Sequence, residues 1–527
     1  MRKTWKKGAA LVLAGVMALG MASMAADEPA GSSGARRETS KTDKKTITCE
    51  EASFTESVPR AEKTRIIITQ DGEVDDMNSL IHTLLYANDL DIAGIVQSSS
   101  SLHFSGHDDV EPYRWMGTDW MNDFMDAYEA VYPNLKVHDA DYMTPEEVRA
   151  ITKVGNIKDN GEMEEVTEGS ELIKACILDE DERTLYIGIG GGANTVGRAL
   201  KSIEEEYKET DKWKEIYEKV TKKVVLTPWG NQDNVYQSYI SVVWPDIRTM
   251  DVSGVSGPVG YSYGTQDIPF LAKKKMEGSF MYEHLVNGHG PLMDLYVTWG
   301  DGTYLEGEEW GSQFGVNEEM VGTTNWWGGS FFGAAYNRYD FLSEGDSPDW
   351  MIAIPTGLRS LEDPSYGGWG GRYALDSETT PHYSQARGEV TMSHWMEAIM
   401  SEFAARADWC IEDSFENANH APEVAVVEGL DFEAAAGEEI TLTAKAFDPD
   451  GNDVSIYWWE YEEADTYTKA EGSDGVRLGA VEGNQAGVIV RIPADAKSGD
   501  TIHIILEAND NARHALYAYQ RVIITIK

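Results

Sequence analysis

The sequence predicts a mixed α/β domain built on an open, mostly parallel sheet, followed by a small all-β sandwich. Short β-branched runs alternate with amphipathic segments between residue 65 and about residue 227, which is typical of strands joined by helices. From residue 439 onward, apolar residues instead recur at every second position, as in half-buried strands. The length of 527 residues also exceeds that of one ordinary domain.

Residues 1–26 are typical of a cleaved signal peptide. Basic residues open the chain, the apolar stretch 9–21 is too short to favour a permanent membrane span, and Ser23-Met24-Ala25 fits a cleavage site. We therefore expect a secreted protein, extracellular or periplasmic, with no membrane span. Residues 27–60 are rich in Ser, Thr, Glu and Lys and predict a flexible leader.

The α/β domain is expected over residues 61–416. Predicted strands, each β-branched and bounded by polar residues, are 65–69, 90–97, 184–189 and 223–227. Apolar residues at helical spacing predict the helices between them, over 77–85, 115–132, 169–178 and 195–207. From residue 254 to about residue 383 the periodicity fades, which predicts long loops over the edge of the sheet. An amphipathic helix at 394–409 closes the domain.

Residues 417–422 form a predicted linker to an immunoglobulin-like β-sandwich over residues 423–527. The alternation of apolar and polar residues predicts strands at 439–446, 454–461, 487–492, 501–509 and 519–526. Trp458 and Trp459 must point to opposite faces, so at most one of them is available to a binding surface.

The formal net charge of −46 arises from 90 acidic and 44 basic residues. Such a surface repels nucleic acid backbones and anionic membranes, and this excludes both as expected partners. The chain has three cysteines, Cys49, Cys176 and Cys410, which allow at most one disulfide. They are far apart in the sequence and fit no metal-ligand spacing. The composition is compatible with neutral substrates and bound divalent cations.

Three aspartates mark the point where the first strand passes into the first helix. Asp71, Asp75 and Asp76 lie at the carboxyl end of a predicted parallel strand, where ligands usually bind in open α/β sheets. Helix capping explains one or two of them. A hard cation held by oxygen ligands explains all three. From the residues alone both interpretations stay open.

The D-x-x-x-D-D pattern of these aspartates resembles the calcium site of inosine–uridine nucleoside hydrolases. The segment TQDGEVDDMNSL resembles the corresponding sequence of their secreted relatives, a nucleoside-hydrolase-like family that includes bacterial cellulose-binding proteins. The resemblance implies that Asp71 and Asp76 ligate Ca²⁺, that Asp75 binds a sugar hydroxyl, and that Asp71 also takes a proton from the attacking water. The hydrolases usually carry one more aspartate, at the position of Thr69.

Two further segments join the predicted site through the resemblance. Asp346 lies in a Glu-Gly-Asp-Ser-Pro run, which by itself indicates an ordinary acidic turn. By the resemblance it corresponds to the distant aspartate ligand of the hydrolases. Glu344 is the alternative ligand and is otherwise expected to bind the substrate. Gly345 replaces the histidine that contacts the leaving group. After the glycines at 190–192, Ala193 corresponds to the residue that lends calcium a backbone carbonyl, with the substrate contact Asn194 behind it.

Loops after the later strands supply the remaining candidates. Asn231, Gln232 and Asp233 follow a predicted strand and are candidates for binding sugar hydroxyls, although an ordinary polar loop explains them as well. His289 and Trp369 stand in motifs that resemble the secreted family. His289 is a candidate proton donor to a leaving group, or only a hydrogen-bonding residue. Trp369 is a candidate stacking face for a sugar or base, or a residue that packs loops onto the core.

These observations lead to three functional expectations. The first is a calcium-dependent hydrolase of glycosidic bonds, acting on the N-glycosidic bond of a nucleoside-like small molecule. The second is a non-catalytic binding protein for plant polysaccharide such as cellulose, built on the hydrolase fold. The third is a structural partner that uses the sandwich. Hydrolases of this type often form oligomers, so a homo-oligomer is also compatible with the sequence.

Overall fold

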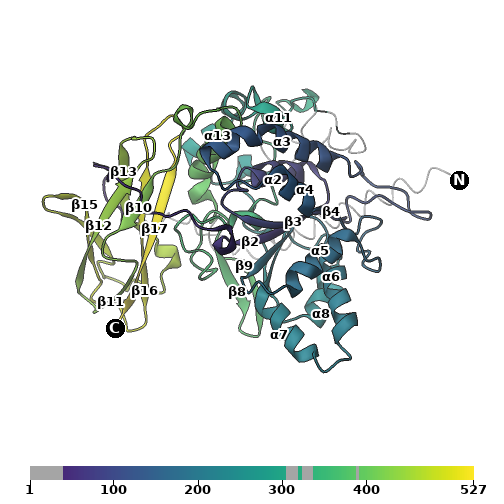
Figure 1. Ribbon diagram of the computed structural model, residues 1–527. Coiled ribbons are helices and arrows are strands. Elements are labelled where there is room, and N and C mark those ends of the chain that lie inside the picture. The colour runs from purple at the N-terminus through teal and green to yellow at the C-terminus, as the bar shows by residue number, and fades with distance from the viewer. Residues whose placement is uncertain (1–39, 304, 306–317, 323–335, 387–390) are drawn as a thin grey trace. The chain divides into compact units, whose positions relative to one another are not determined.

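The computed structural model describes residues 40–303, 305, 318–322, 336–386 and 391–527 (Figure 1). The predicted signal peptide and the first part of the leader lie outside these residues. Trp326 and Trp327, which are near Trp369 in sequence and join it in the predicted stacking face, lie outside them as well. In the part of the chain that is described, no helix is long and apolar enough to cross a membrane.

An eight-stranded sheet forms the centre of the α/β region, in the order β4-β3-β2-β5-β6-β7-β9-β8. Every neighbouring pair is parallel except β8 and β9, which confirms the predicted mostly parallel sheet. The strands are β2 (Arg65–Gln70), β3 (Asp91–Gln97), β4 (Thr152–Val154), β5 (Leu185–Ile189), β6 (Val224–Pro228), β7 (Arg248–Met250), β8 (Tyr373–Ser377) and β9 (Thr380–Gln385).

Helices cover both faces of this sheet, because its central strands are apolar on both sides. Ile66 and Ile68 of β2 belong to one buried cluster, whereas Ile67 belongs to the other. The first cluster includes side chains of α2 (Val74–Leu84), α3 (Trp120–His138), α4 (Pro145–Ile151) and α13 (Met396–Trp409). The second includes side chains of α5 (Glu168–Leu178), α6 (Asn194–Tyr207) and α7 (Trp213–Lys223). Figure 1 shows α2, α3 and α13 on one side of β2 and β3, and α5 to α7 on the other.

The predicted long loops between residues 254 and 383 contain more structure than expected. Short helices cross this region: α9 (Phe270–Lys275), α10 (Gly278–Met281), α11 (Gly290–Met293) and α12 (Pro348–Met351). The β8–β9 hairpin begins at Tyr373, and β9 continues the sheet beside β7. These elements are too short or too polar to show a period of their own, so pairing with distant segments defines them.

Two sheets with the order β1-β13-β16-β17-β11 and β10-β12-β15-β14 form the predicted C-terminal sandwich around a shared apolar core. The strands are β1 (Lys45–Ile47), β10 (Glu423–Val426), β11 (Asp431–Ala434), β12 (Glu439–Phe447), β13 (Val454–Glu460), β14 (Arg477–Val481), β15 (Asn484–Arg491), β16 (Thr501–Asn509) and β17 (Tyr517–Ile526). Trp458 points into the sandwich core and Trp459 into the core of the α/β region, so both are buried.

The prediction of a flexible leader up to residue 60 is wrong for its described part. Residues 45–47 form β1, which pairs with β13, and Ile47 enters the sandwich core. Residues 40–527 form one compact unit. The five-stranded sheet contributes Trp459 and Tyr519, and Tyr461 follows β13, in the same apolar cluster as Trp395, which precedes α13. The domain boundaries at residues 416 and 423 stay a prediction.

Candidate functional site

Acidic side chains from two distant parts of the chain meet at the carboxyl end of β2. Asp75 and Asp76 lie in the first turn of α2, and Asp346 lies just before α12. Carboxylate oxygens of these three residues all come within 4.8 Å of one another. Gly72, with φ +86°, makes the sharp turn between β2 and α2 that brings Asp75 and Asp76 to the end of the strand. We call Asp71, Asp75, Asp76 and Asp346 the acidic site.

Asp71 lies next to this three-carboxylate group but faces a different partner. Its backbone N–H donates to Oδ1 of Asp76 over 3.3 Å, and its own Oδ1 accepts the N–H of Glu73 over 3.1 Å. Its Oδ2 lies 3.5 Å from Nδ1 of His103. Asp75, which the resemblance assigns to a sugar hydroxyl, therefore lies in the group suited to a cation, with Asp71 beside that group.

The carboxylates of the acidic site differ in their pKa values. Burial raises the pKa values of Asp75, Asp76 and Asp346 well above the ordinary range, and the neighbouring carboxylates raise them further. Burial opposes ionisation of Asp71 as well, but the charge of His103 and hydrogen bonds from His103 and Ser100 outweigh it. The pKa of Asp71 is therefore lowered. Asp71 is ionised at neutral pH.

The donor set fits a hard cation. Carboxylate oxygens are the ligands that Ca²⁺ prefers, and a bound divalent charge offsets the mutual repulsion of buried carboxylates. Gly190 leaves the space that such an ion needs. A Cβ atom at this position would lie 2.7 Å from Oδ1 of Asp76 and 3.2 Å from Cγ of Asp346. The backbone therefore approaches the two carboxylates as closely as only glycine permits.

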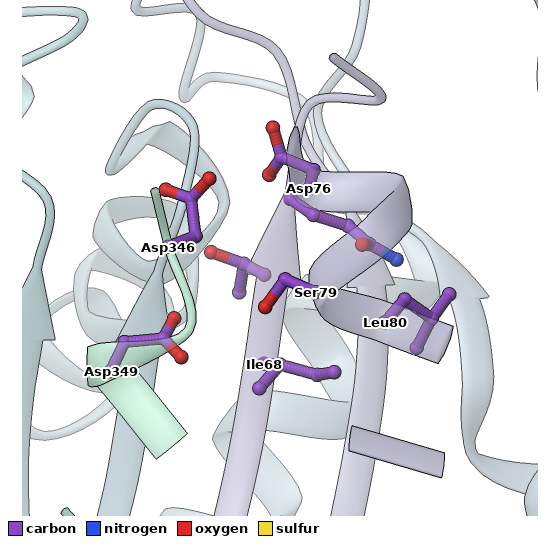
Figure 2. Close-up of a pocket in the computed structure, with 8 residues that line it drawn as sticks. Ile68, Asp76, Ser79, Leu80, Asp346 and Asp349 are labelled. Atoms are coloured by element: carbon purple, nitrogen blue, oxygen red, sulfur yellow. The ribbon is translucent and has the colours of Figure 1, made fainter. Parts of the chain in front are cut away.

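Asp349, which sequence analysis missed, adds a further carboxylate beside the site. It lines a cavity of about 10 Å³ together with Thr69, Ser79, Asp76 and Asp346, which is room for about one water molecule. Its Oδ1 atom is buried and has no hydrogen-bond partner. Figure 2 shows Asp76, Asp346 and Asp349 around the strand that carries Ile68. The signal in the sequence that could have identified Asp349 is its position three residues after Asp346, in the first turn of α12.

His103 is the second residue that sequence analysis missed. It comes from the loop after β3, is 1% exposed, and its Nδ1 lies 3.8 Å from Oε2 of Glu73 as well as near Asp71. Nη2 of Arg114 lies 3.6 Å from Oε1 of Glu73. His103 and Arg114 therefore place two basic side chains beside the carboxylates of Asp71 and Glu73. No motif marks them, because a lone histidine and a lone arginine in a polar loop have no periodic signal.

Residues of the predicted glycine-rich segment pack behind the site. The amide of Asn194 donates to Oγ of Ser99 over 2.8 Å and to the carbonyl of Asn156 over 2.9 Å, so protein partners already use it. The carbonyl of Ala193 accepts the N–H of Gly197 over 2.7 Å at the start of α6. These contacts join the loops after β3, β4 and β5.

The three predicted sugar-binding residues in the loop after β6 point in different directions. Gln232 donates a side-chain hydrogen bond to the carbonyl of Gly190, beside Asp76. Asp233 is buried against the amino end of α6, and burial raises its pKa to about 6, against the opposing effect of backbone N–H groups. Asn231 is exposed and bonds to Asn234 over 3.0 Å. Gln232 therefore extends toward the acidic site, and Asp233 supports the segment behind it.

Three sequence-predicted residues have other partners in the structure. Glu344 is 1% exposed, and its carboxylate bonds to His82, Tyr296 and Ser347, so protein partners already hold its oxygens. Trp369 is 3% exposed inside the apolar core and provides no stacking face. Nε2 of His289 lies 3.2 Å from Oδ1 of Asp408 in α13, which also contacts His514 of the sandwich, and not beside Asp71. Motif spacing identified these residues but not the direction of their side chains.

Two family models match the chain. The nucleoside hydrolase-like domain of cellulose-binding Sde182 matches residues 65–373, which is more than half of the chain, and the C-terminal domain of cellulose-binding protein Sde0182 matches residues 439–526. No curated protein sequence matches.

One solved structure agrees on the fold. A nucleoside hydrolase-related hypothetical protein from Saccharophagus degradans, associated with carbohydrate metabolism, has a TM-score of 0.66 and 24% identity; the match covers 88% of this chain and 100% of that chain. The effector protein XOO4466 has a TM-score of 0.36 and 10% identity, covering 66% of this chain and 94% of that one. The plant nucleoside hydrolase PpNRh1 has a TM-score of 0.31 and 8% identity, covering 66% and 99%. The last two scores are too low to support an argument. On the match of its family model, the chain belongs to the cellulose-binding Sde182 family with a nucleoside hydrolase-like domain.

Proposed function

We propose that the protein is a calcium-dependent hydrolase that cleaves a glycosidic bond, and that this is the N-glycosidic bond of a nucleoside-like compound. The observation that carries the proposal is the grouping of Asp75, Asp76 and Asp346 within 4.8 Å, next to an ionised Asp71. Helix capping does not explain it, because Asp346 belongs to another part of the chain. Buried carboxylates at this spacing require either protonation or a cation.

Each carboxylate has a role in this reaction. A bound Ca²⁺ would supply a fixed positive charge that favours ionisation of the attacking water. Asp71 accepts the proton of that water, because it is the member of the site that is ionised and lies beside the cation group. Asp75 is the only partly exposed member and takes a sugar hydroxyl. The negative charge of the group stabilises the oxocarbenium-like sugar that forms as the leaving group departs.

The test measures sugar release from a panel of nucleosides and short β-glucans, with Ca²⁺ and with chelator. Calcium-dependent release of free sugar from a nucleoside is the expected result. Release that chelator leaves unchanged would contradict the role of the metal, and absence of release from every nucleoside would contradict the reaction.

The family and the signal-like amino terminus also support a site of action outside the cell, and fractionation of the native host culture tests this.

Non-catalytic binding of plant polysaccharide is the second candidate. The observation that favours it is the placement of His289, since the predicted proton donor to a leaving group pairs with Asp408 instead of reaching the acidic site. The description of the family as cellulose-binding supports the same function. Retention on insoluble cellulose, unchanged by Asp71→Asn and accompanied by no sugar release, would establish this candidate. Passage through the cellulose without retention would exclude it.

A further inference from the structure

Side-chain oxygens from three segments of the chain meet at one end of the sandwich. Asp448 follows β12, Asp510 follows β16, and Asn419 lies in the segment before β10. Nδ2 of Asn419 donates to Oδ2 of Asp510 over 2.6 Å, and Oδ1 of Asn419 accepts from Nδ2 of Asn452 over 3.3 Å. One asparagine therefore bridges both turns.

One oxygen in this group has no partner. Oδ1 of Asp448 accepts the backbone N–H groups of Asp450 and Asn452, over 3.0 Å and 2.8 Å. The residue is 5% exposed, and its Oδ2 is buried without a hydrogen-bond donor. A buried carboxylate oxygen without a donor costs free energy, and such an atom indicates either a missing ligand or a bound proton.

The charges around Asp448 are negative. Burial raises the pKa of Asp448 to about 6, and the carboxylates of Asp510 and Asp450 raise it as well. Asp510 is 1% exposed and also has a raised pKa, first because of burial. Its Oδ1 accepts from the backbone amides of Ala512 and Leu516, which are neutral donors. Asp450 is committed to His420, which it contacts with both oxygens over 3.0 Å and 2.7 Å.

We propose that Asp448, Asp510 and the side-chain amide of Asn419 form a second binding site for a hard divalent cation, and that this cation is Ca²⁺. The free Oδ2 of Asp448 and the Oδ2 of Asp510 supply two carboxylate oxygens, the donor type that Ca²⁺ selects. Nδ2 of Asn419 now donates to Oδ2 of Asp510 and to the carbonyl of His514 over 3.2 Å. A half-turn of the amide on cation binding releases both bonds, exchanges its nitrogen and oxygen, and presents Oδ1 to the cation. This exchange conserves the shape of the side chain.

The site has a mechanical consequence. The carbonyl of Asn419 accepts from Nε1 of Trp409, at the end of α13, over 2.9 Å. The neighbouring His420 stacks on Phe415 with ring centroids 3.6 Å apart. A cation bound to Asn419, Asp448 and Asp510 thus holds the segment after α13 against two turns of the sandwich. The bound cation stabilises this connection by mass action.

The test counts bound Ca²⁺ by calorimetric titration of the full-length mature protein and its Asp448→Asn variant. The asparagine retains an oxygen for the two backbone N–H groups, but it places an amide nitrogen where the free oxygen was. We expect one fewer bound Ca²⁺ in Asp448→Asn than in the wild type. Glu482→Gln, an exposed residue at the β14–β15 turn, removes the same charge and should retain the wild-type count. An unchanged count in Asp448→Asn would overturn the proposal.

A melting experiment separates loss of a cation from a general folding defect. In chelator, Asp448→Asn should melt at or above the wild-type temperature, because it removes a buried unpartnered carboxylate. In excess Ca²⁺ it should melt below the wild type. A variant that is destabilised equally in both conditions would overturn the proposal. Asp346→Asn distinguishes the two sites: it should remove the ion of the acidic site and leave the ion at Asp448, whether or not the protein is a hydrolase.

Discussion

Oδ2 of Asp71 and Nδ1 of His103 lie 3.5 Å apart, so the carboxylate that follows β2 faces a buried imidazole from the loop after β3. The imidazole gives Asp71 a different electrostatic environment from Asp76 and Asp346, which face one another. Burial alone raises the pKa values of all three. The contact with His103 keeps Asp71 ionised, and this asymmetry separates a proton acceptor from the carboxylates that suit a cation.

Asp71→Asn should abolish hydrolysis of the glycosidic bond without unfolding the protein. An amide cannot accept the proton of the attacking water, and loss of a general base lowers the rate by about 10²- to 10⁴-fold. Steady-state kinetics on the active nucleoside measures kcat, and the melting temperature measures folding. Asp43→Asn, at an exposed position near β1, is the matched control and should retain full activity. Undiminished turnover in Asp71→Asn would remove the proposed base.

Gly190→Ala should prevent Ca²⁺ from binding at the acidic site. Its methyl group would lie 2.7 Å from Oδ1 of Asp76, in the space between two proposed ligands. We expect Ca²⁺ to raise Tm in an Asp448→Asn background and to have no effect once Gly190→Ala is added. Gly260→Ala is the control, because its nearest neighbour would be 3.4 Å away, an ordinary contact. An equal Ca²⁺-dependent rise in both variants would contradict the proposed position of the ion.

His503 predicts a pH dependence of stability. Burial lowers the pKa of His503 to about 3, with help from the charge of Arg521, whose Nη1 lies 3.1 Å from Nδ1 of His503. The unfolded chain, with a histidine pKa of about 6.5, therefore binds more protons than the folded one between pH 6.5 and 3. Folding stability from this residue is complete above pH 6.5 and is lost as the pH falls toward 3.

His503→Asn should reduce this pH dependence. The asparagine oxygen takes the place of Nδ1 and accepts from Arg521, but it does not titrate. Urea unfolding midpoints of variant and wild type, measured at several pH values from 7 to 4, should converge toward acid pH. A constant difference between the two proteins over that range would show that titration of His503 does not contribute.

Arg521→Met should destabilise the connection between β17 and the α/β region. Nε of Arg521 donates to the carbonyl of Leu358 over 2.6 Å, and Nη2 donates to the carbonyls of Tyr366 and Gly367 over 2.8 Å and 3.0 Å. Methionine fills a similar space but leaves these buried carbonyls without donors, at a cost of about 3 kcal/mol.

Equilibrium urea unfolding measures that loss. Arg491→Met, in which the removed side chain pairs with Glu439 and is 45% exposed, should cost less than about 1 kcal/mol. If Arg521→Met costs no more than Arg491→Met, the hydrogen bonds of Arg521 do not hold the two parts together.

The sequence alone determined the mostly parallel sheet, the sandwich and the aspartates at the end of β2. Strands such as β2 and helices such as α2 show their periodicity within a few consecutive residues. The turn that places Asp75 and Asp76 is likewise encoded in a short stretch, by its residue types. Asp346 required a resemblance, because its run is too short to have a signal of its own. The hairpin β8–β9 and the strand β1 were missed because pairing with distant strands defines them.

Only the tertiary structure decided which side chains face the acidic site. His103 reaches it from the loop after β3 and Asp349 from the first turn of α12, whereas Glu344, Trp369 and His289 lie in recognisable motifs and bond or pack elsewhere. The physical reason is that a motif specifies backbone and residue type over a short stretch. The direction in which a side chain points depends on the partners that fill the space around it, and those partners come from the whole fold.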